Sequence, residues 1–194
     1  MAEGKRLPSS ISWPWIVAAA AAIAAAGVTL SVMGQVPICK CGYVKLWHGV
    51  AVSSETSQHI ADWYTPSHIV HGFLFYGLLF LTARSWPVGA RVIAATLLEG
   101  GWELLENTSF VINRYREETI ALDYYGDSVL NSISDIGAML LGFALAARLP
   151  VWASIALIVA AEIGGAYAIR DNLSLNILML IYPIEAVRRW QTGS

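Results

Sequence analysis

The sequence predicts an all-α integral membrane protein with six transmembrane helices and two longer periplasmic loops. Hydrophobic residues make up 56% of its 194 residues and charged residues only 13%, about half the ~25% that is typical of a soluble domain. Six apolar segments recur along the chain, and the polar residues that interrupt them gather at matching segment ends. We therefore expect a single membrane domain over residues 1–194, whose surplus apolar surface meets the lipid bilayer.

The first apolar segment covers residues 13–33 and follows Lys5 and Arg6, an arrangement that signal peptides share. Its length distinguishes the two. A spanning helix needs about 20 residues, whereas the apolar region of a signal peptide has about 7–15. We expect a retained transmembrane helix here.

Five further apolar segments follow, and we expect each to cross the membrane. Pro66, Pro87 and Pro150 stand at or just before segment starts, where a missing N–H costs a helix little. The last segment is short for a span and contains Pro183, which also suits a tilted or kinked helix packed on its neighbours. The five segments are residues 67–84, 88–107, 127–147, 151–168 and 172–187.

Basic residues orient the six predicted spans. Six crossings put both termini and the arginines of the short loops on one side, which the positive-inside rule assigns to the cytoplasm. Five tryptophans fall at the same end, as in an interfacial aromatic belt. The loops at about 34–66 and 108–126 then lie in the periplasm. The basic residues are Lys5, Arg6, Arg84, Arg91, Arg148, Arg188 and Arg189, and the tryptophans are Trp13, Trp15, Trp86, Trp152 and Trp190.

Ionisable residues within the spans gather at one side of the predicted bilayer. Each costs at least ~2.5 kcal/mol at the bilayer centre, so their presence indicates a function by default. They open even-numbered spans and close odd-numbered ones, and antiparallel helices bring those ends to the same side. The residues are His68, His71, Glu99, Glu103, Glu106, Asp127, Asn131, Asp135, Glu162 and Asn176.

Helical spacing makes three of these sets into stripes. The intervals of three and four residues put His68 and His71 on one helix face, as they do for the three glutamates of residues 99–106 and for the polar residues of 127–135. Facing one another, the stripes form a buried carboxylate and imidazole cluster beneath the outer loops. At least one carboxyl should then be protonated at neutral pH, unless an arginine, a metal or a histidinium neutralises it.

The cluster has three readings. His68 and His71 with Glu103 or Glu106 suit a divalent metal such as zinc, which activates water at an open coordination position. Without metal, the same groups can act as a general acid and base. As a purely structural alternative, the histidines hydrogen-bond to the outer loops, and the polar network locks the helices together at ~0.6 kcal/mol per bond.

Two other sets of residues have open roles. Arg114 and Arg116 can clamp a phosphate or carboxylate, or pair with neighbouring acidic residues. We group them with Glu99 and Asp135 as candidate substrate contacts. Cys39 and Cys41 lie on the oxidising side, where a disulfide, metal binding with His48 or His59, and free thiols all remain open.

Several function classes are excluded by pattern. A net charge of -2 and the lack of a Lys/Arg run argue against a nucleic-acid partner. Phosphate-binding glycine loops, a nucleophile elbow and HExxH are also missing from the sequence. Nothing in the sequence therefore names a reaction directly.

Three segments carry a resemblance to a known family: ICKCGYVKLWHGV, SSETSQHIADWYTPSHIVHGFLFYG and EGGWELLENTSFVINRYREETIALDYYGDSVLNSISD. They look like an uncharacterised family of bacterial multi-pass inner-membrane proteins under a UPF/DUF-type label, which implies a bacterial inner-membrane location and no activity. A shorter pattern resembles VanZ-like membrane proteins, which are linked to glycopeptide resistance. It consists of Glu103, Glu106, Arg114, Asp123, Asp127, Asn131, Gly137 and Gly142.

These observations lead to three functional hypotheses. The first is an enzyme at the periplasmic face that hydrolyses or transfers a group on a lipid-linked substrate. His68, His71, Glu103, Glu106, Asp127 and Asn131 are its candidate catalytic residues. The second is a non-enzymatic binding or assembly protein whose polar cluster fixes the outer loops. The third, a proton or ion pathway, is weakened because the inner half of the spans has almost no ionisable residues.

Overall fold

The structure is a computed structural model that describes residues 11–119 and 123–193. Its described residues form eight helices and no strand, so the predicted all-helical class is confirmed. Lys5 and Arg6 lie outside the described residues. The helices are α1 (Trp13–Val32), α2 (Thr65–Thr82), α3 (Val88–Glu106), α4 (Ser109–Glu118), α5 (Val129–Ala146), α6 (Val151–Ile169), α7 (Leu173–Ile181) and α8 (Glu185–Thr192).

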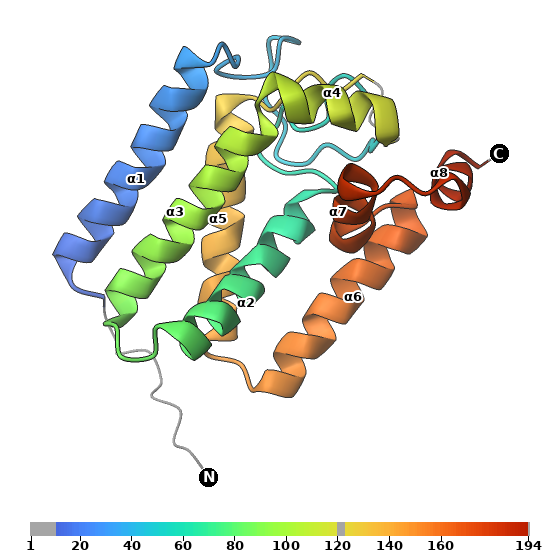
Figure 1. Cartoon of the computed structure of the whole chain (residues 1–194). Coiled ribbons are helices and arrows are strands. Elements are labelled where there is room, and N and C mark those ends of the chain that lie inside the picture. The colour runs from blue at the N-terminus through green and yellow to red at the C-terminus, as the bar shows by residue number, and fades with distance from the viewer. Residues whose placement is uncertain (1–10, 120–122, 194) are drawn as a thin grey trace.

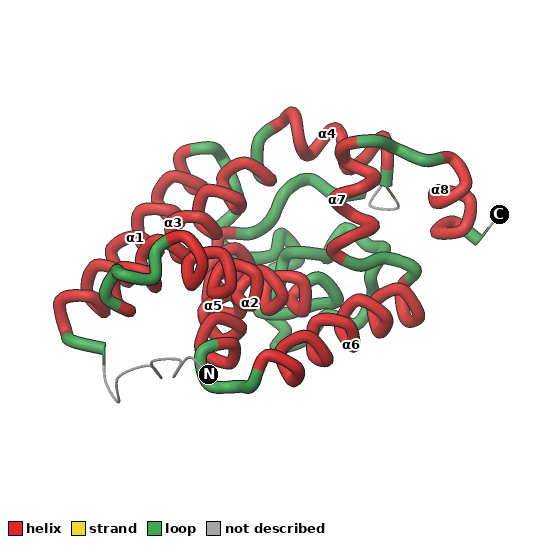
Figure 2. The backbone as a smooth tube through the Cα atoms, turned by 60° about the horizontal axis from the view of Figure 1, so that its bottom comes forward, coloured by secondary structure: helices red, strands yellow, loops and turns green. Residues whose placement is uncertain are grey.

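The helices of 18 to 20 residues form the body of the molecule, and the shorter helices lie at one of its ends (Figure 1). Helices α1, α2, α3, α5 and α6 run the length of the bundle, while α4, α7, α8 and the loop before α2 cover one end. Viewed from below, α1 and α3 lie side by side, α2 and α5 occupy the centre, and α6 stands apart (Figure 2). We call the covered end the pocket end.

The α2 and α5 helices make the most extensive contact in the bundle, and two glycines make it close. A Cβ added at Gly72 would lie 2.5 Å from the backbone N of Phe143, and one at Gly142 would lie 2.9 Å from the carbonyl carbon of Ile69. Because neither glycine carries a side chain, the two backbones touch directly, as small residues permit in membrane helices. Buried Ile136, Met139 and Phe143 fill the core beside this contact.

Within the part of the chain that the structure describes, three helices are long and apolar enough to cross a membrane, judged by length and composition: α1, α5 and α6. No residue of α6 is buried, and the side chain of Tyr167 is 91% exposed. Helices α2 and α3 have similar lengths of 18 and 19 residues, but they carry the histidines and glutamates of the predicted cluster. Their composition is therefore more polar than that of an ordinary span.

The predicted sixth helix over residues 172–187 is absent as a continuous helix. In its place α7 and α8 are separated by a break at Tyr182–Ile184, where Pro183 supplies no N–H and removes a helical hydrogen bond. The nine residues of α7 rise only ~14 Å, against the ~30 Å of a bilayer core. As a result, α8 lies at the pocket end, opposite the start of α1 (Figure 1).

The described parts of the two predicted outer loops, residues 34–66, 108–119 and 123–126, belong to the pocket end. Residues 108–126 contain α4, whose N-cap Thr108 accepts a hydrogen bond from the N–H of Val111. The loop before α2 is fastened to the start of α5, because Gln58 Nε2 donates to the carbonyl of Gly126 at 2.7 Å and Ser128 Oγ donates to that of Gln58 at 3.1 Å. These bonds hold the loop before α2, residues 34–64, over the start of α2 and the end of α3. We call this loop the roof.

Candidate functional site

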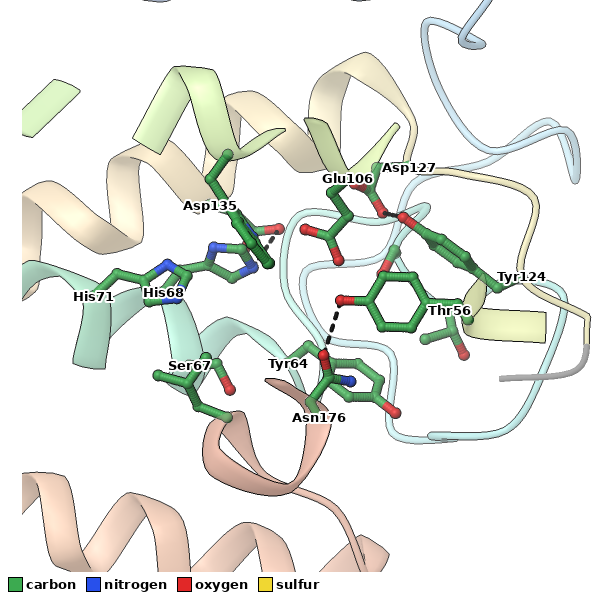
Figure 3. Close-up of a pocket in the computed structure, with 14 residues that line it drawn as sticks. Thr56, Tyr64, Ser67, His68, His71, Glu106, Tyr124, Asp127, Asp135 and Asn176 are labelled. Atoms are coloured by element: carbon green, nitrogen blue, oxygen red, sulfur yellow. Dashed lines mark hydrogen bonds and ion pairs between the residues drawn. The ribbon is translucent and has the colours of Figure 1, made fainter. Parts of the chain in front are cut away.

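A pocket opens beneath this roof, where α2, α3, α5 and α7 converge (Figure 3). Its cavity has a volume of about 50 Å³, enough for roughly three water molecules at ~10–15 Å³ each. Histidine, carboxyl, tyrosine and small hydroxyl side chains share its wall with a few apolar ones. The lining residues are Thr56, Ser57, Tyr64, Ser67, His68, His71, Trp102, Glu106, Tyr115, Tyr124, Asp127, Asp135, Leu173 and Asn176.

One buried carboxylate holds both predicted histidines. Glu99 is fully buried, and its oxygens lie 2.7 Å from Nδ1 of His68 and 3.0 Å from Nδ1 of His71. Both Nδ1 atoms therefore donate to Glu99, because a carboxylate can only accept. In a neutral ring that carries its proton on Nδ1, the lone pair is on Nε2, and both histidines line the pocket. The helical spacing predicted this encounter of α2 with α3.

Glu103 and Asp135 approach His68 from α3 and α5. Glu103 Oε1 lies 3.5 Å from His68 Nδ1, and Asp135 Oδ2 lies 3.7 Å from His68 Nε2. Glu103 is 1% exposed, yet neither of its carboxylate oxygens has a hydrogen-bond partner among the described residues. Asp135 has one, the hydroxyl of Thr65 at 3.3 Å. Of the two, Glu103 is the buried carboxyl that lacks a hydrogen-bond partner among the described residues.

Asp127 lies in the loop just before α5, on the other side of Glu106 from Asp135 (Figure 3). It accepts hydrogen bonds from Asn107 Nδ2 at 2.7 Å and from the Tyr124 hydroxyl at 2.9 Å. Burial raises the pKa of Asp127 to about 6, although both hydrogen bonds act in the opposite direction. This carboxyl can therefore exchange a proton close to neutral pH.

Sequence reasoning missed the tyrosines of the pocket. Tyr64 donates to Asp171 at 3.2 Å, and Tyr115 donates to Asn176 Oδ1 at 2.8 Å. Burial raises the pKa of Tyr115 well above its usual value, so the hydroxyl keeps its proton. These residues come from the loop before α2, from α4 and from the start of α7. In the sequence, only the polar residues at the ends of the predicted apolar segments pointed to this region of the molecule.

Three predicted site residues lie elsewhere. Asn131 donates from Nδ2 to the carbonyl of His59 at 2.8 Å, which ties the roof to α5. Arg114 donates to the carbonyl of Leu180 at 2.9 Å and pairs with Glu118 at 3.2 Å, so acidic pairing is realised for this arginine. Arg116 is exposed. None of the three lines the pocket.

A second polar cluster lies in the loop before α2. Cys39 and Cys41 form a disulfide, which decides among the alternatives that their spacing left open. Nearby, Glu55 accepts hydrogen bonds from Tyr43, Lys45 and His59 at 2.9, 2.6 and 3.0 Å. These partners lower the pKa of Glu55 to about 2, the Lys45 hydrogen bond most of all. With its acidic group fully paired, this cluster stabilises the loop.

Fold and site together define a helical-bundle protein with a roofed polar pocket at one end and long apolar helices below it. Residues 30–193 match the profile of a family described as "Protein of unknown function (DUF2585)", and the chain belongs to that family. The resemblance to an uncharacterised UPF/DUF-type family is thereby confirmed.

Named relatives give the same result. The chain is 58% identical to a UPF0314 protein of Paracoccus denitrificans over 171 residues, which cover 88% of this chain and 89% of the relative. It is 54% identical to a UPF0314 protein of Sinorhizobium fredii over 182 residues, or 94% and 92% of the two chains. A Novosphingobium aromaticivorans UPF0314 protein is 50% identical, with coverage of 88% and 92%. No solved structure matches the chain.

Proposed function

We propose that this chain is a multi-pass protein of the bacterial inner membrane whose pocket hydrolyses or transfers a group on a lipid-linked substrate at the periplasmic face. The observation that carries the proposal is the pocket itself, where two histidines and three carboxyls line one cavity at the end of apolar helices. Ionisable groups inside membrane-spanning helices mark functional sites by default.

Each step of such chemistry has a candidate group. His71 is oriented by Glu99 through Nδ1, so its Nε2 can accept a proton from water or from a substrate hydroxyl. Asp127, whose pKa is raised to about 6 by burial, can return a proton to a leaving group. Glu106 lies between Asp135 and Asp127 (Figure 3) and is a second acid or base. Trp102 and Leu173 offer apolar contact for the lipid part.

The arrangement in the membrane follows from the five long helices. We place α1, α2, α3, α5 and α6 across the bilayer, with α7 and α8 at the pocket end. The apolar surface of α6, none of whose residues is buried, supports a lipid environment. This arrangement replaces the six-span hypothesis and leaves the start of α1 and α8 on opposite sides.

Orientation has a new basis in this arrangement. With Arg188 and Arg189 on α8, the pocket end carries more of the described basic residues than the opposite end, so the positive-inside rule no longer supports a periplasmic pocket end. The Cys39–Cys41 disulfide supports it, because disulfides persist in the oxidising periplasm. Exposed Trp13, Trp86 and Trp152 at the opposite end suit a cytoplasmic interface. An alkaline phosphatase reporter fused after Gly193 should be active, and an inactive one would reverse the orientation.

The enzyme proposal is tested by comparing lipids of a deletion strain that produces the wild-type chain, His71→Ala, Glu106→Gln or Asp127→Asn. The deletion strain should accumulate a lipid-linked species that the wild-type chain removes and the three variants do not, at equal amounts of chain in the membrane. Glu162→Gln on α6 is the matched control, since Glu162 lies outside the pocket lining and should restore the wild-type lipid pattern. Full restoration by all three pocket variants would exclude the enzyme.

A second function, a binding or assembly role without chemistry, is favoured by the exposed apolar side chains of the loop before α2. Leu46 is 79% exposed, and Trp47, Val50 and Val52 are about half exposed. A group of exposed apolar side chains on this loop suits contact with a partner or with the membrane interface. Replacing Leu46 and Trp47 by serine should then abolish this contact while the lipid pattern stays that of the wild type.

A further inference from the structure

We propose that His68, Glu103 and Asp135 hold a divalent transition-metal ion of the zinc class. The inference deepens the proposed function, because it names a cofactor for the same pocket. The three residues come from α2, α3 and α5, and their donor atoms all lie within 4.8 Å of one another. All three are buried, with exposures of 8%, 1% and 5%.

The first argument is the unmet need of Glu103. A buried carboxylate normally accepts several hydrogen bonds, and leaving one without partners costs several kcal/mol. Neither oxygen of Glu103 accepts one among the described residues, and the basic side-chain nitrogen that approaches it is His68 Nδ1 at 3.5 Å. That nitrogen already donates to Glu99 at 2.7 Å. A cation between the carboxylate and the ring would satisfy both Glu103 and Asp135.

The second argument is the tautomer of His68. Its Nδ1–H donates to Glu99, so a metal ion that displaces the second ring proton would bind Nε2, the atom that lies 3.7 Å from Asp135 Oδ2. A carboxylate behind a ligating histidine is the usual outer-shell arrangement of metal sites, and it raises the basicity of the ligand. Glu99 is then a positioning residue rather than a ligand.

The third argument is distance. Zinc binds histidine nitrogen and carboxylate oxygen at ~2.0–2.2 Å, so two ligands 3.7 Å apart can reach one ion. Tetrahedral ligands stand ~3.3 Å apart, which the remaining donors reach by shifts of less than ~1 Å each. Three protein ligands leave a fourth position for water, and the adjoining cavity of about 50 Å³ can hold it.

The group formed by His68, His71 and Glu99 is the competing site, and its geometry disfavours a metal. Its nitrogen and oxygen atoms are 2.7–3.1 Å apart, which is the length of a direct charge-assisted hydrogen bond. Ligands of one zinc ion stand ~3.3 Å apart, so these atoms would have to separate and give up their protons to admit an ion. The predicted ligand set of His68, His71 and Glu103 therefore changes, with Asp135 in the place of His71.

The test measures metal in the purified full-length chain in detergent micelles. The chain is stripped with a chelator, dialysed against zinc, freed of unbound ion and analysed for elements. We expect about one zinc per wild-type chain, and at least a tenfold weaker affinity for Glu103→Gln and Asp135→Asn. Glu99→Gln should weaken zinc binding 10- to 100-fold by releasing His68. Glu162→Gln is the control and should bind as the wild type does.

The melting temperature is the second measurement, and it also shows whether a variant that binds no zinc is folded. Zinc at 100 times its wild-type dissociation constant should raise the melting temperature of the wild type by roughly 5–10 °C, and that of Asp135→Asn by about half as much or less. Equal zinc in wild type and both ligand variants, or no zinc at all, would overturn the inference. The proposed function fails separately if zinc binds while the pocket variants give the same lipid pattern as the wild-type chain.

Discussion

Replacing Gly72 by alanine should separate α2 from α5 and thereby open the candidate site. A Cβ at this position would lie 2.5 Å from the backbone N of Phe143 and 2.8 Å from the carbonyl carbon of Gly142, with the Met139 carbonyl oxygen closer still. Real Cβ atoms essentially never come within 3.0 Å of such atoms. The helices must therefore move apart by at least half an ångström, because no flexible side chain is available to give way.

Overpacking of this kind costs ~1–3 kcal/mol, which corresponds to a fall of roughly 2–12 °C in the melting temperature of a chain of this size. His68 lies one turn before Gly72, so its distance to Asp135 on α5 should also increase. Thermal unfolding of the purified chain in detergent, followed by circular dichroism, measures the first effect, and zinc affinity measures the second.

The control is Gly77→Ala on the same helix, where an added Cβ meets nothing within 4 Å. It should melt at or slightly above the wild-type temperature, because alanine is the better helix former. If Gly72→Ala and Gly77→Ala melt alike, the two backbones do not touch at Gly72, and the reasoning is refuted.

Three further results are expected. Burial raises the pKa of Asp171 from 3.8 to about 6, so its stabilising contribution is complete below pH 4 and on the order of 3 kcal/mol is lost as the pH rises to about 6. The melting temperature should fall over that range in the wild type, and a flat profile identical to that of Asp171→Asn would contradict it. Gly126→Ala should destabilise the chain by ~1–3 kcal/mol in chemical unfolding, more than Gly34→Ala, since both have positive φ but only Gly126 is crowded, by Gln35 and Asn107. Alkylation of the unreduced denatured chain should label neither cysteine and, after reduction, both; labelling before reduction would contradict the disulfide.

Helical periodicity predicted the centre of the site well. The three- and four-residue intervals placed His68, His71, Glu99 and Glu103 on facing stripes, and α2 and α3 bring them together. Such a prediction succeeds because a helix fixes the direction of every side chain once its face is known. The first five predicted segments also coincide with helices to within two residues at each end.

The rest depends on connections, for which no such periodicity exists. Asn131 belongs to the same spacing as Asp127 and Asp135, but α5 starts only at Val129, so the side chain at the first turn reaches the roof instead. Tyr64, Tyr115 and Asn176 enter the pocket from a loop, a surface helix and a short helix. Their positions follow from tertiary hydrogen bonds that no single-sequence pattern encodes.

The isolation of α6 has a mechanical consequence for the pocket. This helix contacts the bundle mainly along α2, and it leads through Asp171 directly into α7, which contributes Leu173 and Asn176 to the pocket wall. In the proposed bilayer, acyl chains surround most of α6, so lipid length and lateral pressure set its tilt. Because a tilt of α6 moves α7 with it, a change in bilayer thickness would change the width of the pocket.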